Sequence, residues 1–259
     1  MLALLTGCPR SGTQLLTRLC NTHPEVRITM EFGSLRTLWM PPKFLALHQI
    51  HAFWSRKFPI IHDGHGDWRS RRAWLSSYKF LLRFLWALRR FRYQDVGPRQ
   101  LESVYRDVTG CKIVGDKLPA YVLSLEQYVL IENLKVVVIH RHPAAVIRSY
   151  LELVQGNWRR IPTLNRFNNE VEVAKLWAQS VGILRRHWES VLPISYERLC
   201  EDPVGECRKL GEWFDIEPEG FDLSCVQAPK PLPRFSDEVL GQIREVVHEE
   251  CSFLGYELD

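Results

Sequence analysis

The stretch GCPRSGTQ, residues 7–14, decides the fold, because it joins an apolar run to an amphipathic one. Residues 1–6 (MLALLT) are long enough for a buried strand and too short for a helix. Residues 14–20 (QLLTRLC) place three leucines on one face of a helix. A strand, a glycine-bounded turn and a helix together aim backbone N–H groups at an anion. We therefore predict that residues 7–14 form a phosphate-binding loop.

The loop has the glycine spacing of a nucleotide-binding P-loop, GxxxxGK[ST], but it lacks the two reactive positions of that motif. Thr13 stands in place of the lysine, and Gln14 stands in place of the magnesium-binding hydroxyl. The loop is therefore poorly equipped for metal-assisted phosphoryl transfer. It carries Arg10 as a cation and Ser11 as a hydroxyl donor instead. A plain turn before a core helix would explain the glycines but not the Pro-Arg-Ser between them.

Residues 7–13, the two leucines after the loop, and HPEVR at residues 23–27 resemble the 5′-phosphosulfate loop region of sulfotransferases. These enzymes use 3′-phosphoadenosine-5′-phosphosulfate (PAPS). The resemblance is closest to the branch with PRSGT loops, which includes tyrosylprotein sulfotransferases and many bacterial enzymes. It implies that the loop binds the cofactor through Arg10, Ser11, Gly12, Thr13 and Gln14. Gln14 stands where the family usually has a second threonine, and its amide can still donate a hydrogen bond.

The remaining sequence alternates short apolar runs with helical patterns. We predict strands at residues 1–6, 111–114, 134–140 and 191–195, and helices at residues 14–20, 73–93, 144–154, 170–190, 204–214 and 237–253. Residues 26–30 are predicted to be a connector, and residues 35–72 an irregular segment with short helices. Strands separated by helices indicate an α/β fold, a three-layer sandwich around a central parallel sheet. The resemblance implies the P-loop-like sulfotransferase version of that fold.

Several chemically useful residues directly follow predicted strands. The loop at residues 7–14, Lys117, Arg141 and Tyr196 all occupy such positions. Ligands of parallel α/β sheets bind beyond the carboxyl ends of the strands. The sequence therefore predicts that these residues share one site, and this prediction does not depend on the resemblance.

Arg141 and Ser149 lie eight residues apart across a predicted strand-to-helix turn. A guanidinium and a hydroxyl that converge there suit a terminal phosphate. Taken alone, the pair is equally consistent with a surface salt bridge and a solvated serine. The resemblance implies that both hold the 3′-phosphate of the cofactor and that Tyr196 lies near the adenine or that phosphate. Lys230, in a late loop, is a further possible contact.

Sulfuryl transfer to a hydroxyl needs a base and cations that stabilise the leaving oxygen. Glu31 lies 21 residues after Arg10, the separation between loop arginine and catalytic glutamate in the tyrosylprotein branch. The resemblance implies that Glu31 is the base and that Lys117 is a catalytic lysine which neutralises charge together with Arg10. Asp116 and the histidines at positions 48–65 are the alternative bases.

Length and composition limit the remaining choices. A chain of 259 residues with 46% hydrophobic content can form one domain, here residues 1–259. We expect residues 35–110 to be an acceptor-binding or lid insertion. The net charge of +4 suits an anionic cofactor but not a nucleic acid. Seven scattered cysteines without a CxxC pair argue against a disulfide framework or a zinc site. With no leader or anchor sequence evident, they indicate a cytoplasmic protein.

The predicted helix at residues 73–93 is basic and amphipathic. Its predicted apolar side carries Trp74, Leu75, Tyr78, Leu81, Leu82, Leu85 and Leu88. Its charges exclude a membrane span. Such a helix can contact a membrane surface or an acidic partner, and it can equally be a core helix with a solvated basic face.

Together these features predict a metal-free, PAPS-dependent sulfotransferase. It would move a sulfuryl group to an acceptor hydroxyl on a tyrosyl residue, a sugar or a small molecule, and release adenosine 3′,5′-bisphosphate. A P-loop kinase or other NTPase and a non-catalytic nucleotide-binding module are the alternatives. The sequence leaves the acceptor and the oligomeric state open.

Overall fold

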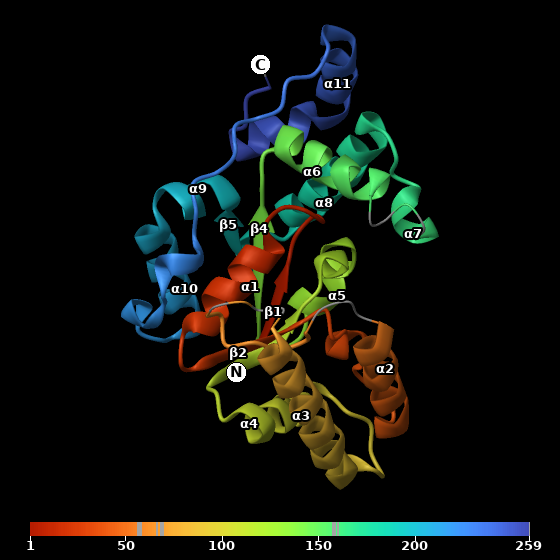
Figure 1. The fold of residues 1–259 in the computed structure, drawn as a ribbon, viewed down its shortest axis with the longest axis vertical. Coiled ribbons are helices and arrows are strands. Elements are labelled where there is room, and N and C mark those ends of the chain that lie inside the picture. Colours follow the sequence, from red (N-terminus) through yellow and green to blue (C-terminus); the bar gives the residue numbers. More distant parts are fainter. Residues whose placement is uncertain (56–58, 66, 68–69, 157–158, 160, 259) are drawn as a thin grey trace.

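A single parallel sheet organises the computed structural model, which describes residues 1–55, 59–65, 67, 70–156, 159 and 161–258. Five strands pair in the order β2-β3-β1-β4-β5. They are β1 (Leu2–Thr6), β2 (Val26–Met30), β3 (Ile113–Lys117), β4 (Leu134–His140) and β5 (Leu192–Ser195). Helices cover both faces of this sheet, so the predicted three-layer α/β sandwich is confirmed (Figure 1).

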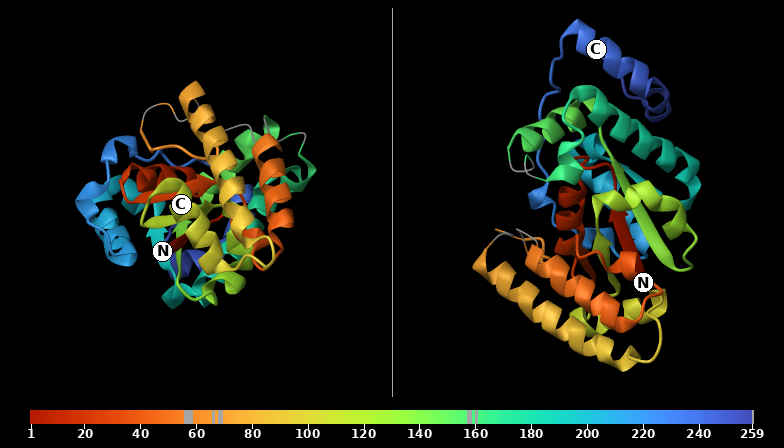
Figure 2. Two further views of the ribbon diagram at one scale, coloured as in Figure 1. Left: turned by 90° about the horizontal axis from the view of Figure 1, so that it is seen from below. Right: turned by 90° about the vertical axis from the view of Figure 1, so that its right-hand side faces the viewer.

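The helices fall into three groups by the apolar residues that they share. One face of the sheet packs against α1 (Thr13–Thr22), α9 (Tyr196–Glu201) and α10 (Pro203–Phe214). The other face packs against α3 (Arg71–Leu88), α4 (Pro98–Thr109) and α5 (Leu125–Val129). A third apolar cluster joins α6 (Pro143–Gln155), α8 (Glu170–Arg186) and α11 (Asp237–Leu254). Figure 2 shows α11 at one end of the molecule and α3 at the opposite end, beside α2 (Pro42–Ser55).

The remaining elements are short. They are the α-helix α7 (Pro162–Asn165) and the 3₁₀ helices η1 (Ser34–Thr37), η2 (Arg89–Phe91), η3 (Pro119–Ser124), η4 (Trp188–Ser190), η5 (Pro218–Gly220) and η6 (Leu223–Cys225).

Local capping explains why several predicted helix ends are accurate. Asn169 accepts a hydrogen bond from the Glu172 N–H at the start of α8, and Ser236 does the same from Val239 before α11. Gly255, with φ of 73°, ends α11 in the left-handed conformation that glycine tolerates best. These caps are encoded locally, so the sequence alone can reveal them.

The structure corrects the prediction at the edge of the sheet. Residues 26–30, predicted to be a connector, form the edge strand β2, which pairs with β3 in the register Val26 to Ile113. Val26 and Ile28 face the α1 layer, and every residue of the strand except Arg27 is buried. The five residues mix polar and apolar side chains, so neither a continuous apolar run nor a clear alternation marks the strand in the sequence. The neighbouring strand begins at Ile113 rather than residue 111, and Lys117 is its last residue rather than part of the following turn.

Residues 35–110 are more regular than predicted. They include the fourteen-residue helix α2 and the unpredicted helix α4. The predicted helix at 73–93 is α3, but its buried face differs from the predicted one, because Leu75, Tyr78 and Leu82 are exposed. Phe80 and Phe84 face the core instead and stack around Phe32. A helix with apolar residues on two sides does not reveal by its periodicity which of the two the core will cover.

The described helices include none that is both long enough and apolar enough to cross a membrane. The α3 and α4 side chains share one apolar cluster with β1, β3 and β4. The extent of the domain and the acceptor-binding role of residues 35–110 stay predictions.

Candidate active site

The carboxyl ends of all five strands carry a predicted site residue or motif. The loop at residues 7–14 follows β1, Glu31 follows β2, and Lys117 ends β3. Arg141 follows β4 and Tyr196 follows β5. Parallel strands end at one edge of their sheet, so the fold gathers residues that are far apart in the chain. Gly7 and Tyr196, for example, are 189 positions apart.

The two glycines of the loop are required by close approaches of other residues. A Cβ on Gly7 would lie 2.2 Å from the carbonyl oxygen of Ile139, and one on Gly12 would lie 2.4 Å from Cδ2 of Tyr196. Gly12 also has φ of 98°, outside the range of most side-chain-bearing residues. The Ser11 N–H donates to the Cys8 carbonyl at 3.0 Å, which closes the turn before α1 begins at Thr13. The loop is therefore closely packed, and a side chain at Gly7 or Gly12 would clash with neighbouring residues.

Arg10 is the centre of the cationic part of the site. Its backbone is left-handed, with φ of 78°, which is uncommon for a residue other than glycine. Its Nε donates to Ser149 Oγ at 3.0 Å, and its carbonyl accepts from Arg141 Nη1 at 3.3 Å. Burial, and then the charge of Arg141, lower the pKa of Arg10. Ser149 therefore binds the side chain of Arg10 directly. Its connection to Arg141 runs through Arg10, whose carbonyl accepts the hydrogen bond from Arg141.

The second guanidinium is held from two sides. Arg141 Cζ lies 4.1 Å from the centre of the Tyr196 ring, a cation–π contact. The indole N–H of Trp177 donates to the Arg141 carbonyl at 2.9 Å. The residues Ser149, Arg10, Arg141 and Tyr196 therefore form one contiguous series, as the shared-site prediction requires.

This site has the chemistry of an anion-binding cradle. Ser11 Oγ and Arg141 Nε are buried and have no hydrogen-bond partner within the part of the chain that the structure describes. Ser11 lines a small internal cavity together with Cys8 and Trp177. Buried polar atoms are normally paired, so the unpaired Nε donor of Arg141, whose guanidinium also contacts the Arg10 carbonyl, points to an anionic ligand. The residues therefore fit a phosphate- or sulfate-bearing molecule.

Glu31 and Lys117 form an ion pair at the ends of β2 and β3. Lys117 Nζ donates to Glu31 Oε1 at 3.1 Å. The lysine side chain is 0% exposed and the glutamate side chain 21% exposed, so only the carboxylate reaches solvent. Glu31 also has a left-handed backbone, with φ of 55°, and its N–H donates to the Lys117 carbonyl. The two residues predicted to be catalytic are thus locked together by backbone and side chain.

Asp116, one of the alternative bases, is surrounded by hydrogen-bond donors of the protein. This completely buried carboxylate accepts hydrogen bonds from the backbone N–H groups of Phe32 and Gly33 and from the hydroxyls of Thr29 and Tyr121. Burial raises the pKa of Asp116, while these hydrogen bonds oppose the shift. Because it ties down the two residues after Glu31, Asp116 positions the candidate base.

The histidines between positions 48 and 65 are spread over different surroundings. His62 is buried against Met30, and burial lowers its pKa to about 4. His65 pairs with Asp222, the residue that precedes η6. His48 lies near the residues after the candidate base, because a Cβ on Gly33 would be 2.7 Å from its Cε1 atom. The fold therefore places both His48 and His62 beside residues that flank Glu31 in the chain.

Other predicted contacts are less central. Thr13 is buried and Gln14 is half-buried in the first turn of α1. Lys230 is exposed in the late loop.

Sequence reasoning missed the support that the C-terminus gives to this site. Tyr256 donates to Glu197 Oε2 at 2.8 Å, and Glu197 Oε1 accepts the N–H of His142, the residue after Arg141. The FLGY motif that contains Tyr256 was the available signal.

Comparison with known proteins identifies the family of the chain. The family model described as the sulfotransferase family matches residues 3–220, and the chain belongs to this family. The sulfotransferase domain of the Synechococcus PCC 7002 olefin synthase is a structural neighbour, with TM-score 0.62 and 16% identity over 100% of this chain and 95% of that one. The sulfotransferase domain of the curacin biosynthetic pathway has TM-score 0.57 and 16% identity, over 100% and 98% of the two chains.

A third neighbour is the sulfotransferase STF9 of Mycobacterium avium, with TM-score 0.59 and 16% identity over 99% of this chain and 77% of that one. At such identities these neighbours show the fold alone. A search of curated protein sequences found no match to the chain. The family and the fold confirm the resemblance seen in the loop sequence.

Proposed function

We propose that this sulfotransferase moves a sulfuryl group from PAPS to the hydroxyl of an acceptor. The observation that carries the proposal is the placement of the Glu31–Lys117 ion pair and the Arg10–Arg141 cation pair at the same strand ends. The first pair supplies a carboxylate for proton abstraction, and the second supplies positive charge for a phosphate-bearing donor.

The loop and the cation pair share the binding of the co-substrate in this proposal. Backbone N–H groups of the loop, with Arg10, Ser11, Gly12, Thr13 and Gln14, hold the 5′-phosphosulfate end. Arg141, Ser149 and Tyr196 hold the 3′-phosphate and adenine end. The unpaired Nε donor of Arg141 belongs to the second of these ends, which supports an anionic group there.

The proposed catalytic roles follow from the charges of these side chains and, for Glu31, from its partial exposure. Glu31 takes the proton of the acceptor hydroxyl while the acceptor oxygen forms its bond to sulfur. Lys117 and Arg10 stabilise the charge that collects on the phosphate oxygen as its bond to sulfur breaks. PAPS supplies the activated sulfuryl group, and adenosine 3′,5′-bisphosphate is the second product. The proposal uses no metal ion.

The acceptor is a hydroxyl compound, with tyrosyl residues, sugars and small molecules as candidates. We propose that residues 35–110 form its binding region within a single domain, since η1 and α2 follow Glu31 directly and His48 of α2 contacts Gly33.

Two measurements test the proposal. Calorimetry with adenosine 3′,5′-bisphosphate should show binding, and 5′-AMP, which lacks the 3′-phosphate, should bind much more weakly. Labelled PAPS in the presence of a chelator should then label at least one compound in a panel of tyrosyl, sugar and small-molecule acceptors. Absence of binding heat rejects the proposal. Magnesium-dependent ATP turnover would support the kinase or NTPase alternative, and binding without transfer would support a non-catalytic module.

A further inference from the structure

Positive charge is concentrated in one segment of the chain. Between Glu31 and Asp95 the sequence holds twelve Lys or Arg residues and only two acidic residues, Asp63 and Asp67. This segment alone has a net charge of +10, whereas the whole chain has +4, so the remainder is net negative. Such an asymmetry indicates a partner surface of opposite charge.

The same segment exposes two rows of large apolar side chains. On α2 the row consists of Phe44, Leu47, Ile50 and Trp54, and on α3 it consists of Leu75, Tyr78, Leu82 and Trp86. Each row has helical spacing of three or four residues, so its members lie on one side of their helix. Trp54 and Trp86 are 72% and 75% exposed, which is unusual for tryptophan.

The two rows belong to one surface. Helices α2 and α3 pack against each other and lie side by side at the end of the molecule opposite α11 (Figure 2). The ring of Phe53 joins them, because its centre lies 5.3 Å from that of Trp54 and 6.4 Å from that of Tyr78. We call these eight exposed residues the α2–α3 face. Contiguous exposed apolar surface of this kind marks an interaction site.

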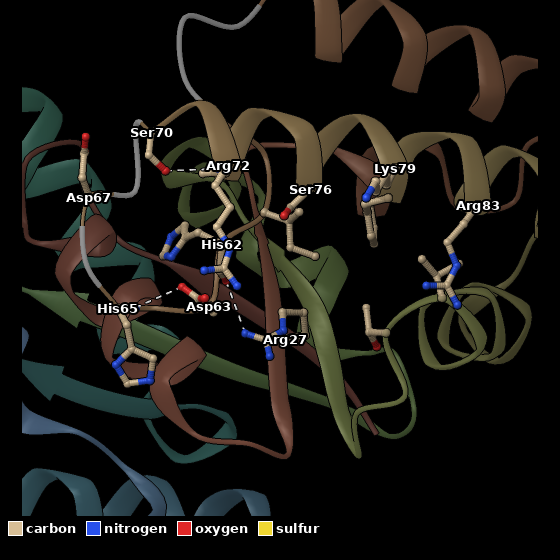
Figure 3. A pocket seen from close by; sticks show the side chains of 15 residues that line it. Arg27, His62, Asp63, His65, Asp67, Ser70, Arg72, Ser76, Lys79 and Arg83 are labelled. Carbon is tan, nitrogen blue, oxygen red and sulfur yellow. Dashed lines mark hydrogen bonds between the residues drawn. The ribbon is translucent and has the colours of Figure 1, made fainter.

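A basic row runs along α3 next to the apolar one. Arg72, Ser76, Lys79 and Arg83 follow each other at helical spacing and line a cavity of about 590 Å³. Figure 3 shows Arg72, Lys79 and Arg83 projecting from α3 into this cavity, with Arg27 of β2 on its opposite wall. None of the three α3 cations has a hydrogen-bond or ion-pair partner among the described residues. Asp63 and Asp67 line the same cavity at its Arg72 end, away from Lys79 and Arg83 (Figure 3).

We propose that the α2–α3 face docks on an anionic lipid surface. Its aromatic and leucine side chains enter the boundary between headgroups and acyl chains, and the row of Arg72, Lys79 and Arg83 binds lipid phosphate groups. This inference does not depend on the proposed function. A second copy of the chain is a poor occupant, because it would bring two segments of charge +10 together. An anionic bilayer matches both the apolar rows and the basic row, since it has an apolar interior beneath a negatively charged surface.

Vesicle co-sedimentation of the full chain tests the proposal. We expect binding to phosphatidylcholine vesicles that contain about 30 mol % phosphatidylserine, and weaker binding in about 0.5 M NaCl, because salt screens surface charge. The double variants Trp54→Ser/Trp86→Ser and Lys79→Gln/Arg83→Gln should each lower the partition coefficient at least about tenfold. All four positions are exposed, so circular dichroism should show unchanged folding.

Matched controls lie outside the face. Leu130→Ser changes an 84% exposed leucine near the start of β4, and Arg185→Gln/Arg186→Gln removes two charges from α8. Both should bind vesicles as the wild type does. Equal binding to pure phosphatidylcholine, or equal loss in face and control variants, overturns the proposal. So does a dimer, seen by sedimentation velocity, that the face variants alone abolish, because the face would then be a protein interface.

Discussion

Lys117 donates a hydrogen bond to Glu31 over 3.1 Å from a position that is closed to solvent, while the carboxylate of Glu31 remains partly exposed. The pair therefore has an inner and an outer member. The inner ammonium is fixed by the end of β3, and the outer carboxylate is partly open to solvent. Since both main chains are also hydrogen-bonded, neither residue can move independently of the other.

Glu31→Gln should lower turnover by about 10²-fold or more, because the amide keeps the size of the side chain but cannot take a proton. Affinity for adenosine 3′,5′-bisphosphate should be nearly unchanged, since Glu31 does not belong to the cation pair. Steady-state kinetics with PAPS and calorimetry measure the two effects. Glu132→Gln, at a highly exposed position, is the control. A fully active Glu31→Gln enzyme would show that another group is the base, and His48 would be tested next.

Asp116→Asn should destabilise the fold by about 1–3 kcal/mol, because one accepting oxygen becomes an NH₂ group that faces buried donors. It should also lower kcat, since the backbone after Glu31 loses its anchor, but it should leave nucleotide affinity intact. Urea unfolding and kinetics check both parts. The exposed Asp95→Asn provides the control. Loss of nucleotide binding instead would contradict the positioning role.

Arg141→Ala should weaken binding of adenosine 3′,5′-bisphosphate at least about tenfold, because a charged hydrogen-bond donor is removed. Arg141→Lys should restore little of this affinity, since lysine has no planar group to stack on Tyr196, whose ring lies 4.1 Å from the guanidinium carbon. Calorimetry gives both values. Arg148→Ala, at an exposed position on α6, should bind as the wild type does. Full rescue by lysine would mean that charge alone matters.

Gly12→Ala should abolish most nucleotide affinity and cost about 1–3 kcal/mol of stability. The added methyl would lie 2.4 Å from Tyr196 Cδ2, and the backbone would be held at φ of 98°. Gly241→Ala, within α11, is the matched control, because no atom lies within 4 Å of its added methyl. That change should leave stability equal or raise it by about 0.5–1 kcal/mol. An intact Gly12→Ala site would show that the loop is not closely packed.

His62 should make the fold less stable in mild acid. Burial lowers its pKa to about 4, so between pH 4 and its ordinary pKa near 6.5 the unfolded chain binds a proton that the folded chain does not. Stability is therefore lost as pH falls through this window. His62→Gln should reduce the loss between pH 7 and pH 5 by about 1–2 kcal/mol, measured by urea unfolding. His140, whose pKa is also lowered to about 4, continues to contribute in the variant.

The exposed His248→Gln is the control for this measurement and should retain the acid sensitivity of the wild type. If His62→Gln has the same pH profile as the wild type, His62 is accessible to protons in the folded state and its burial is incomplete.

Local sequence was sufficient for the elements whose causes are local. The loop with its two flanking elements follows from glycine spacing and adjacent apolar runs, and α8, α10 and α11 follow from periodicity and capping residues. The burial of β4 followed from its run of β-branched residues. The positions just after these strands then predicted a shared site, because the carboxyl ends of parallel strands meet.

Long-range contacts decided what local patterns could not. Residues 26–30 became a strand because β3 offered a partner, and α3 buried Phe80 and Phe84 because Phe32 and Tyr105 lay opposite. Both choices depend on residues far away in the chain, so no local window contains them.

By itself, then, the sequence determined an anion-binding loop within a parallel α/β sandwich and the family to which the chain belongs. Only the tertiary structure decided that Lys117 is buried against Glu31, that Arg10 rather than Arg141 binds Ser149, and that Asp116 supports the loop. The physical reason is that hydrogen bonds and burial depend on the distance between side chains in space. Sequence spacing limits that distance within one element, but packing sets it between elements.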